Sequence, residues 1–320
     1  MLYIHFLSFP QSLLHLCVPT LAMESSANRQ VDFTVDHSKV KPAEFEGQFF
    51  PETCDEPVGS RMRKIKDLEI RPADVMLCSY PKSGTHWVYR MMDMLLHGAA
   101  EYRREAAPEH TFLDMQRIQN LPHVPSPRIL ITHLPFGRLP RQVEDKRTKI
   151  VYVYRNPKAV LVSFYFQMKD STVFERSGMK DMTVDRFAEL FLSPQVLFGG
   201  LFNHWDEVAT FQSDHPDVPV FRISYEEMSL NPTESVERLA VFLGVACSKE
   251  LCREIAQSCD FRQQKETEET LDAMNKELKF YRKGDMNDWK NHLTVAISER
   301  LDAIVRERAD HCLFSAKYAS

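Results

Sequence analysis

Short apolar runs alternate along the chain with longer segments that suit helices. Four runs have the length and the aliphatic, β-branched or aromatic content of buried strands, at residues 74–78, 128–133, 149–154 and 218–225. Segments compatible with helices follow them, at residues 88–96, 159–168, 183–192, 199–211, 235–243, 247–258 and 296–309. This alternation predicts an α/β fold, a single domain with a central parallel sheet flanked by helices.

Two further regions carry weaker signals. Residues 24–66 are polar, and their phenylalanines are spaced too loosely for a helix, so we predict an irregular segment. These phenylalanines either cover a hydrophobic pocket or attach an N-terminal arm to the core. Residues 101–127 are rich in proline and are predicted to form a loop.

The first 22 residues form an apolar extension without Lys, Arg, Asp or Glu. A secretory signal would lack its basic n-region, and Pro10 and Gln11 would interrupt a membrane-spanning helix. We favour a third interpretation, in which translation starts at Met23. The predicted organisation is therefore an extension over residues 1–22 and a domain over residues 23–320, and a cytoplasmic location is expected.

Composition narrows the functional classes. The formal net charge is −5, which disfavours a general nucleic-acid surface, so an anion site must come from local basic clusters. The cysteine count is odd and no C-x-x-C pair occurs, which favours reduced thiols over a disulfide framework or a zinc site. The seven cysteines are Cys17, Cys54, Cys78, Cys247, Cys252, Cys259 and Cys312.

Residues 80–87 are the strongest candidate for an anion site. A buried strand leads into a loop with Pro81 and Gly84, and a helix follows. This geometry directs backbone N–H groups and a helix dipole at an anion. Lys82 adds a positive charge, and Ser83, Thr85 and His86 add donors. The segment lacks the Walker A spacing, and an ordinary surface turn is the alternative interpretation.

Polar residues follow the other predicted strands. His133 ends the second strand, Arg155 the third and Tyr225 the fourth. Ligands of open parallel sheets bind at this carboxyl edge. A magnesium-dependent phosphoryl transferase would need an Asp where Arg155 stands, so the pattern predicts an anion site without a metal. His133 is the candidate general base, and a structural histidine is the alternative.

Five segments, in this order, resemble the motifs of cytosolic sulfotransferases. The resemblance covers residues 45–314 and rests on YPKSGTHW at 80–87, THLP at 132–135, RNPK through SFY at 155–165, YEEM at 225–228, and RKG with DWKN at 282–291. It implies a P-loop-nucleotide-kinase-like fold and transfer of a sulfuryl group from 3′-phosphoadenosine 5′-phosphosulfate (PAPS) to a small acceptor, with no metal.

The resemblance also implies roles for individual residues. His133 would remove the acceptor proton, and Lys82 would offset charge on the leaving oxygen. The 5′-phosphate would lie in the loop that contains Ser83, Gly84, Thr85 and His86. The other implied nucleotide contacts are Arg155, Ser163, Arg282, Lys283 and Gly284 at the 3′-phosphate, and Trp87, Tyr225 and Phe261 at the adenine.

Aromatic segments correspond to the acceptor-lining parts of the family. Phe49, Phe112 and Phe164 are the residues we expect there, together with the loop after Gly178. They favour a planar or lipophilic phenol, steroid, other alcohol or amine. Two alternatives stay open: a catalytically weak PAPS-fold protein that binds the nucleotide or a small lipophile, and, more distantly, a Golgi membrane sulfotransferase.

Three positions depart from the family pattern. Ile131 stands where a lysine usually precedes the catalytic histidine segment, and the loss of such a donor can cost on the order of 10²-fold in rate. His86 replaces a second threonine and is a candidate substitute donor. Asn287 replaces a glycine, and we expect it to adopt that position's positive φ.

The C-terminal region carries a pattern that resembles the family's short dimer motif. The spacing Lys290-x3-Thr294-Val295-x3-Glu299 matches at all four fixed positions. It predicts a homodimer with a small interface around Val295. The alternative is that these residues only begin the last helix, with Thr294 as its N-cap.

Overall fold

The computed structural model describes residues 40–53, 56–101, 103, 108–169, 181–260 and 283–308, which all belong to one compact unit. The predictions for residues 1–22, the loop after Gly178, Phe261 and Arg282 lie outside these residues. Within the described ranges, no helix is both long and apolar enough to cross a membrane.

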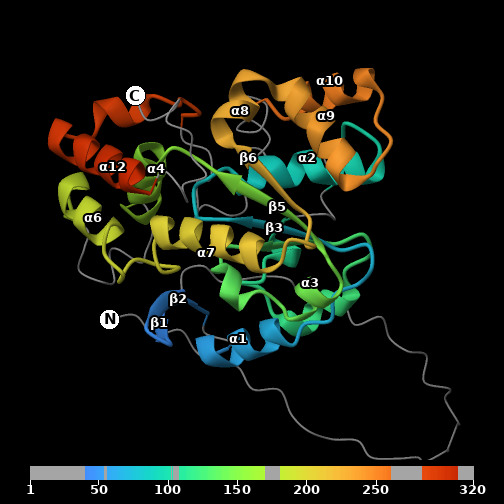
Figure 1. The fold of residues 1–320 in the computed structure, drawn as a ribbon, viewed down its shortest axis with the longest axis horizontal. Coiled ribbons are helices and arrows are strands. Elements are labelled where there is room, and N and C mark those ends of the chain that lie inside the picture. Colours follow the sequence, from blue (N-terminus) through green and yellow to red (C-terminus); the bar gives the residue numbers. More distant parts are fainter. Residues whose placement is uncertain are drawn as a thin grey trace, which may run out of the picture. The chain divides into compact units, whose positions relative to one another are not determined.

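Four parallel strands form the central sheet, as the sequence predicted (Figure 1). In spatial order they are β4 (Ile129–Thr132), β3 (Val75–Ser79), β5 (Lys149–Tyr154) and β6 (Val220–Ser224). Every residue of β3 and β4 is buried, which explains why both read as continuous apolar runs. Because all pairs are parallel, the carboxyl ends of the four strands lie along one edge of the sheet.

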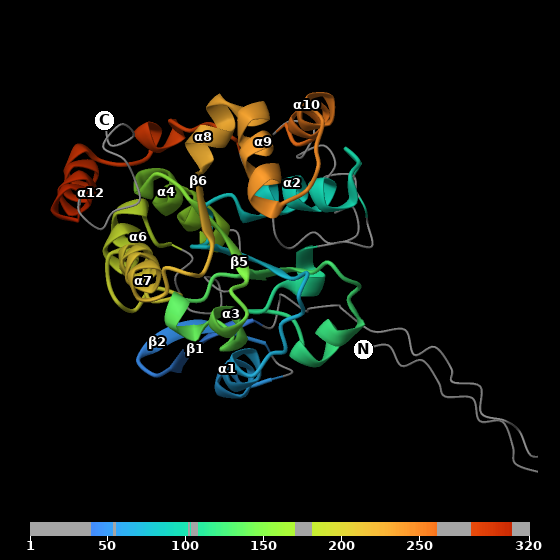
Figure 2. The same cartoon turned by 45° about the vertical axis from the view of Figure 1, so that its right-hand side comes forward.

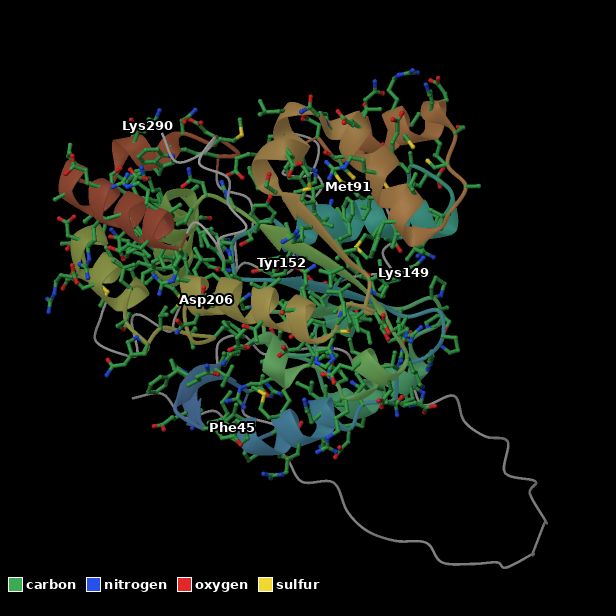
Figure 3. All side chains as sticks on the ribbon, in the orientation of Figure 1. Phe45, Met91, Lys149, Tyr152, Asp206 and Lys290 are labelled. Carbon is green, nitrogen blue, oxygen red and sulfur yellow. The ribbon has the colours of Figure 1, made fainter. Side chains whose placement is uncertain are left out.

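Side chains that alternate along the strands divide the core into two clusters. The first contains Val75 and Leu77 of β3, together with buried residues of one group of helices. This group is α2 (Thr85–His97), α8 (Tyr225–Leu230), α9 (Pro232–Leu243) and α10 (Lys249–Ser258). Figure 2 shows these helices beside one another, and Met91, labelled in Figure 3, belongs to this cluster.

The second cluster lies on the opposite face of the sheet. It contains Met76 and Cys78 of β3 and Tyr152 of β5, which is labelled in Figure 3. The helices that contribute to it are α1 (Val58–Lys66), α3 (Gln142–Asp145), α4 (Pro157–Lys169), α6 (Val184–Phe191), α7 (Leu201–Asp214) and α12 (Val295–Glu307). Each face of the sheet is therefore covered by its own set of helices.

Short 3-10 helices occupy several connections. They are η3 (Pro108–Thr111), η4 (Ile118–His123), η5 (Phe136–Arg138) and η7 (Asp288–Asn291). The first two fall in the region that we predicted as a proline-rich loop, where the fixed φ of proline permits only short helical turns. These connections bring residues 108–123 alongside β4.

The prediction of an irregular segment before residue 66 was wrong in its second half. The strands β1 (Lys41–Phe45) and β2 (Gln48–Glu52) form an antiparallel hairpin. The turn places Glu46 at φ 51° and Gly47 at φ 78°. Glutamate is an unusual residue for a positive φ, so the sequence carried no typical turn signal.

The helix α1 was also missed in this region. Its apolar residues Val58, Met62 and Ile65 are buried at helical spacing, but they are separated by a polar and basic stretch. Three apolar positions in nine residues are a weak periodic signal, and packing on the core decides the structure.

Candidate active site

The loop between β3 and α2 has an unusual backbone. Lys82 has a φ of 69° and Gly84 a φ of 107°, both in the left-handed region. A Cβ atom at Gly84 would lie 2.9 Å from the Tyr225 ring, so both the backbone conformation and the space require glycine. This turn brings the first residues of α2 directly after the loop, at the carboxyl edge of the sheet.

Two buried polar atoms of this segment lack a hydrogen-bond partner within the described structure. They are Ser83 Oγ and Trp87 Nε1. Buried polar atoms are normally paired, so both atoms fit the binding of a polar ligand. The Trp87 ring contacts the Tyr225 ring edge-on, with centroids 5.1 Å apart, and the two rings provide an aromatic surface beside the loop.

Arg155 links three of the strand ends. Its Nη1 donates to the Lys82 carbonyl at 3.2 Å, and its guanidinium lies over the Tyr225 ring, 4.0 Å from the centroid. The structure thus brings Lys82, Arg155 and Tyr225 together from β3, β5 and β6. A bound anion at this place would meet a guanidinium that is already oriented.

The other described residues that we predicted to bind the 3′-phosphate lie on α4 and just before η7. Ser163 is half-buried on α4, and Gly284 has a φ of 71°. Lys283 Nζ donates to the buried Asp288 Oδ1 at 2.8 Å, which anchors this end of the chain to η7. The expectation of a positive φ at Asn287 was wrong, because its φ is −104° and asparagine needs no strain there.

The hydrogen bonds of His133 define its protonation. Its Nδ1 lies 2.7 Å from the carbonyl oxygen of Ser79, and a carbonyl can only accept, so Nδ1 carries the proton. Nε2 therefore keeps its lone pair. Burial is the main cause that lowers the pKa of His133 to about 3, so the ring is neutral near pH 7.

Ser79 also connects His133 to the anion loop, which is residues 80–84 between β3 and α2. The Ser79 hydroxyl lies 3.3 Å from His133 Nδ1 and 2.7 Å from the Thr85 hydroxyl. Ser79 and Thr85 are both buried. A continuous polar chain thus joins the candidate base to the first residue of α2.

Asp114 is a candidate functional residue that the sequence analysis missed. Its carboxylate accepts hydrogen bonds from the Thr132 hydroxyl and the His133 backbone N–H, both at 2.6 Å. Burial raises its pKa to about 7, and these bonds oppose the shift. Arg61 donates to the Asp114 carbonyl at 2.6 Å. A lone aspartate in a loop gave no sequence signal for this position.

Aromatic rings enclose His133 on two sides. The Phe112 ring lies edge-on at a centroid distance of 4.9 Å, and the Phe198 ring at 5.5 Å. Phe198, also missed by the sequence analysis, has a φ of 63°, which is rare for a bulky residue and is typical of functional sites. Its N–H donates to the Phe49 carbonyl at 2.8 Å, and Phe164 packs edge-on against Tyr80.

The position of the family's lysine is apolar here. Ile131 is 1% exposed and belongs to the core cluster on the α2 side of the sheet. His86 is the second residue of α2, directly after the loop. Burial is the main cause that lowers the pKa of His86 to about 3, so it is neutral near pH 7 and keeps one N–H donor. Among the described residues, no group of three or more His, Cys, Asp and Glu side chains could hold a metal ion.

Sequence comparisons agree with this architecture. A family model for the sulfotransferase domain matches residues 72–312. Mouse Sulfotransferase 1A1 is 32% identical over 270 residues, which cover 79% of this chain and 90% of that protein. Bovine Sulfotransferase 1E1 is 33% identical over 265 residues, with coverages of 76% and 85%.

Solved structures give the same class. Mouse SULT7A1 complexed with PAP is similar with a TM-score of 0.68 and 25% identity, and the match covers 87% of this chain and 97% of that one. A retinol dehydratase in complex with androsterone and inactive cofactor PAP is similar with a TM-score of 0.69, coverages of 87% and 92%, and 18% identity, which shows the fold alone.

The fold and the carboxyl-edge site define an enzyme that transfers an anionic group. More specifically, the chain belongs to the sulfotransferase family. The predictions of a sulfotransferase, of its central parallel sheet and of PAPS as sulfuryl donor are confirmed at the level of this family.

Proposed function

We propose that the chain transfers a sulfuryl group from PAPS to a hydroxyl or amine of a small lipophilic acceptor, such as a phenol or steroid, with His133 as general base. The observation that carries the proposal is the bond from His133 Nδ1 to the Ser79 carbonyl. It leaves Nε2 as the ring's proton acceptor, beside the anion loop.

PAPS supplies the activated sulfuryl group. On the protein side, His133 Nε2 takes the acceptor proton as the acceptor oxygen or nitrogen attacks. Lys82, held in the loop by its left-handed backbone, offsets the negative charge that develops on the leaving oxygen. The Ser79 carbonyl stabilises the imidazolium that forms, because it accepts from the Nδ1–H.

The residues of the carboxyl edge would hold the nucleotide. Ser83 Oγ and the N–H groups of the loop would bind its 5′-phosphate, and Trp87 and Tyr225 would contact the adenine. Arg155 and Ser163 would bind the 3′-phosphate, with Lys283 and Gly284. Phe261 and Arg282, outside the described residues, keep the roles that the resemblance implies.

The acceptor would lie against the aromatic rings near His133. Phe112 and Phe198 lie against the base itself, and Phe49 is tied to Phe198 through its backbone. Phe164 would shape the site through Tyr80. These rings favour planar or lipophilic acceptors, because apolar aromatic walls bind such molecules by burial of apolar surface.

A weak enzyme or a nucleotide-binding protein is the second candidate function. Buried Ile131 favours it, since this position lacks the cation that the family usually has. The proposed enzyme requires a substitute donor, and the neutral His86, at the second position of α2, is the side chain that we assign to this role.

We further propose a homodimer and a cytoplasmic location, with residues 1–22 as an extension of a domain over 23–320. The exposed Val295 would form the centre of the interface, with Lys290 and Glu299 at its ends. Thr294 is the N-cap of α12, because its hydroxyl accepts from the Ile297 N–H at 3.4 Å. Capping and dimer contact are compatible roles, since Val295 is 73% exposed.

An acceptor panel with PAPS tests the proposal. Purified full-length protein should sulfate a naphthol or a hydroxysteroid, and His133→Ala should lose turnover while its affinity for 3′,5′-adenosine bisphosphate (PAP) stays near the wild-type value. His215→Ala, at the end of α7, is the matched control and should keep both activities. PAP binding without turnover on any acceptor would favour the binding protein instead.

A further inference from the structure

Two cysteines lie at the start of α10, away from the strand ends that form the candidate active site. Ser248 is the N-cap of this helix, and its hydroxyl accepts from the Leu251 N–H at 3.1 Å. Cys247 therefore occupies the position before the cap, and Cys252 the fourth helical position. In many helices an apolar pair at these two positions forms a hydrophobic staple that fixes the entry of the chain. In this chain both members of the staple are thiols.

The staple brings the two sulfurs very close. The S–H of Cys252 points to the Cys247 sulfur, and the two Sγ atoms are 2.8 Å apart. Both cysteines are free thiols in the structure. A disulfide bond is about 2.05 Å long, so the sulfurs need to approach by only about 0.75 Å to form one.

The two thiols differ in access. Cys247 is half-buried and meets solvent, whereas Cys252 is 1% exposed. The other described cysteines, Cys78 and Cys259, are fully buried, and Cys259 lies against the Met94 sulfur at 3.8 Å. Among the described thiols, this pair alone combines an accessible sulfur with a second sulfur in bonding range.

We propose that Cys247 and Cys252 are a thiol-modification site, which reacts with low-molecular-weight disulfides such as glutathione disulfide and closes as a reversible intramolecular disulfide. The Cys247 thiolate attacks one sulfur of glutathione disulfide and releases one glutathione thiolate. The Cys252 thiolate then attacks the Cys247 sulfur and releases the second glutathione. The two protein thiols lose two electrons and two protons, which glutathione disulfide takes up to become two glutathione molecules.

Access and acidity set the order of these steps. Burial and the neighbouring Cys247 raise the pKa of Cys252 to about 12, so the more accessible Cys247 is the thiol that reacts first. When glutathione is bound to Cys247, that residue no longer has an ionisable thiol. Its contribution to the raised pKa of Cys252 is then lost. Cys252 is already in contact with the sulfur that it must attack, so closure follows without a change of fold.

The disulfide would make the staple of α10 covalent. This helix packs on α9 and α2, and its last residue, Ser258, donates to the Ala100 carbonyl after α2 at 3.2 Å. The modification therefore acts on the helix layer that contains α2, the helix that follows the anion loop. The proposal itself concerns the chemistry of the two thiols and does not depend on the proposed function.

Peptide mapping provides a direct test, because trypsin cleaves after Lys249, between the two cysteines. Fully reduced protein is exposed to glutathione disulfide, alkylated under native and then denaturing conditions, and digested. The disulfide should join the peptides 239–249 and 250–253 into one species that a reductant separates. We expect this species to account for most of the oxidised protein, and its yield to fall to the background level after reduction.

Single substitutions assign the two steps. Cys252→Ser should accumulate glutathione on Cys247, and Cys247→Ser should leave Cys252 unmodified because it is buried. Cys259→Ser, at the C-cap of the same helix, is the matched control and should form the joined peptide at the wild-type rate. Circular dichroism checks that each variant is folded, and the wild-type peptide map decides the question even if one is not.

Two results would overturn the proposal. One is wild-type protein in which glutathione stays on Cys247 while Cys252 remains free. The other is a joined peptide that connects Cys247 to a different cysteine of the chain.

Discussion

Removal of the Asp114 carboxylate should impair turnover through the position of His133. The carboxylate accepts from the Thr132 hydroxyl and from the His133 backbone N–H, both at 2.6 Å, and it touches no residue of the anion loop in these bonds. In Asp114→Ala both donors lose their acceptor inside the protein. The segment that carries the base is then free to shift.

The expected magnitudes follow from these two bonds. An unsatisfied buried donor costs about 1–3 kcal/mol, so Asp114→Ala should lower the free energy of unfolding by about 2–6 kcal/mol. A displacement of a catalytic group by about 1 Å can cost on the order of 10²-fold in rate, and we expect a loss of that order in kcat. Asp114→Asn keeps one acceptor oxygen and should lose about tenfold.

Three measurements distinguish a displacement of His133 from a general loss of protein stability. Initial rates with PAPS and a saturating naphthol give kcat, calorimetry with PAP gives nucleotide affinity, and urea unfolding gives stability. PAP affinity should change by less than about threefold, because no loop atom is lost. Asp74→Asn is the matched control, since Asp74 is a buried carboxylate that pairs with Arg128 at the opposite edge of the sheet.

The Asp74→Asn control should have a lower free energy of unfolding than the wild type but the same kcat. Wild-type turnover in folded Asp114→Ala protein would refute the positioning argument. An equal fall of kcat in Asp74→Asn would also refute it, because the loss would then follow stability and not the position of the base.

Three other predictions follow from the structure. Arg155→Ala should weaken PAP binding by about 2–5 kcal/mol in calorimetry and reduce the preference over the analogue without a 3′-phosphate; a wild type that binds both analogues equally would exclude this role. Val295→Glu should give a folded monomer in light scattering, because it places like charges at the proposed two-fold axis, and a wild type that is already monomeric at micromolar concentration would contradict the dimer. Burial lowers the pKa of His133 and His86 to about 3 and that of His204 to about 4. Since unfolded histidine titrates near 6.5, the unfolded chain binds more protons between these values, so the free energy of unfolding should fall as the pH is lowered from 6.5 towards 4. The raised pKa values of the Asp114, Glu207 and Glu226 carboxyls act in the opposite direction. Only the Asp114 shift is as large as those of the three histidines, so the histidines dominate, and stability that is unchanged in urea unfolding at pH 5.0 and 7.0 would contradict neutral histidines in the folded protein.

Short sequence patterns made the central sheet and the residues at its carboxyl edge predictable. Each strand of the sheet is a mostly apolar run that is followed by a polar motif, so Lys82, His133, Arg155 and Tyr225 could be assigned to one edge before the structure was known. Parallel pairing then requires that these ends be neighbours. The α/β alternation and the strand-end residues thus depend on short stretches of sequence.

Other features depend on contacts between distant segments. Asp114 is a candidate positioning residue because Thr132 and His133 donate to it, and nothing near it in sequence indicates this. Phe198 lies against His133 with its backbone at a positive φ, which its residue type disfavours. The hairpin of β1 and β2 likewise forms around a turn whose first residue is an atypical glutamate. Tertiary packing overrides local preference at each of these places.

The two-sided core has a consequence for how this enzyme can diversify. The rings of Trp87 and Tyr225, which we propose contact the adenine, pack with one cluster, and the rings of Phe164 and Phe198, which we propose shape the acceptor site, belong to the other. Fully buried strands separate the two. Mutations that reshape the acceptor side are therefore insulated from the donor side, so the range of acceptors can drift over evolutionary time, or under directed selection, while the donor stays the same.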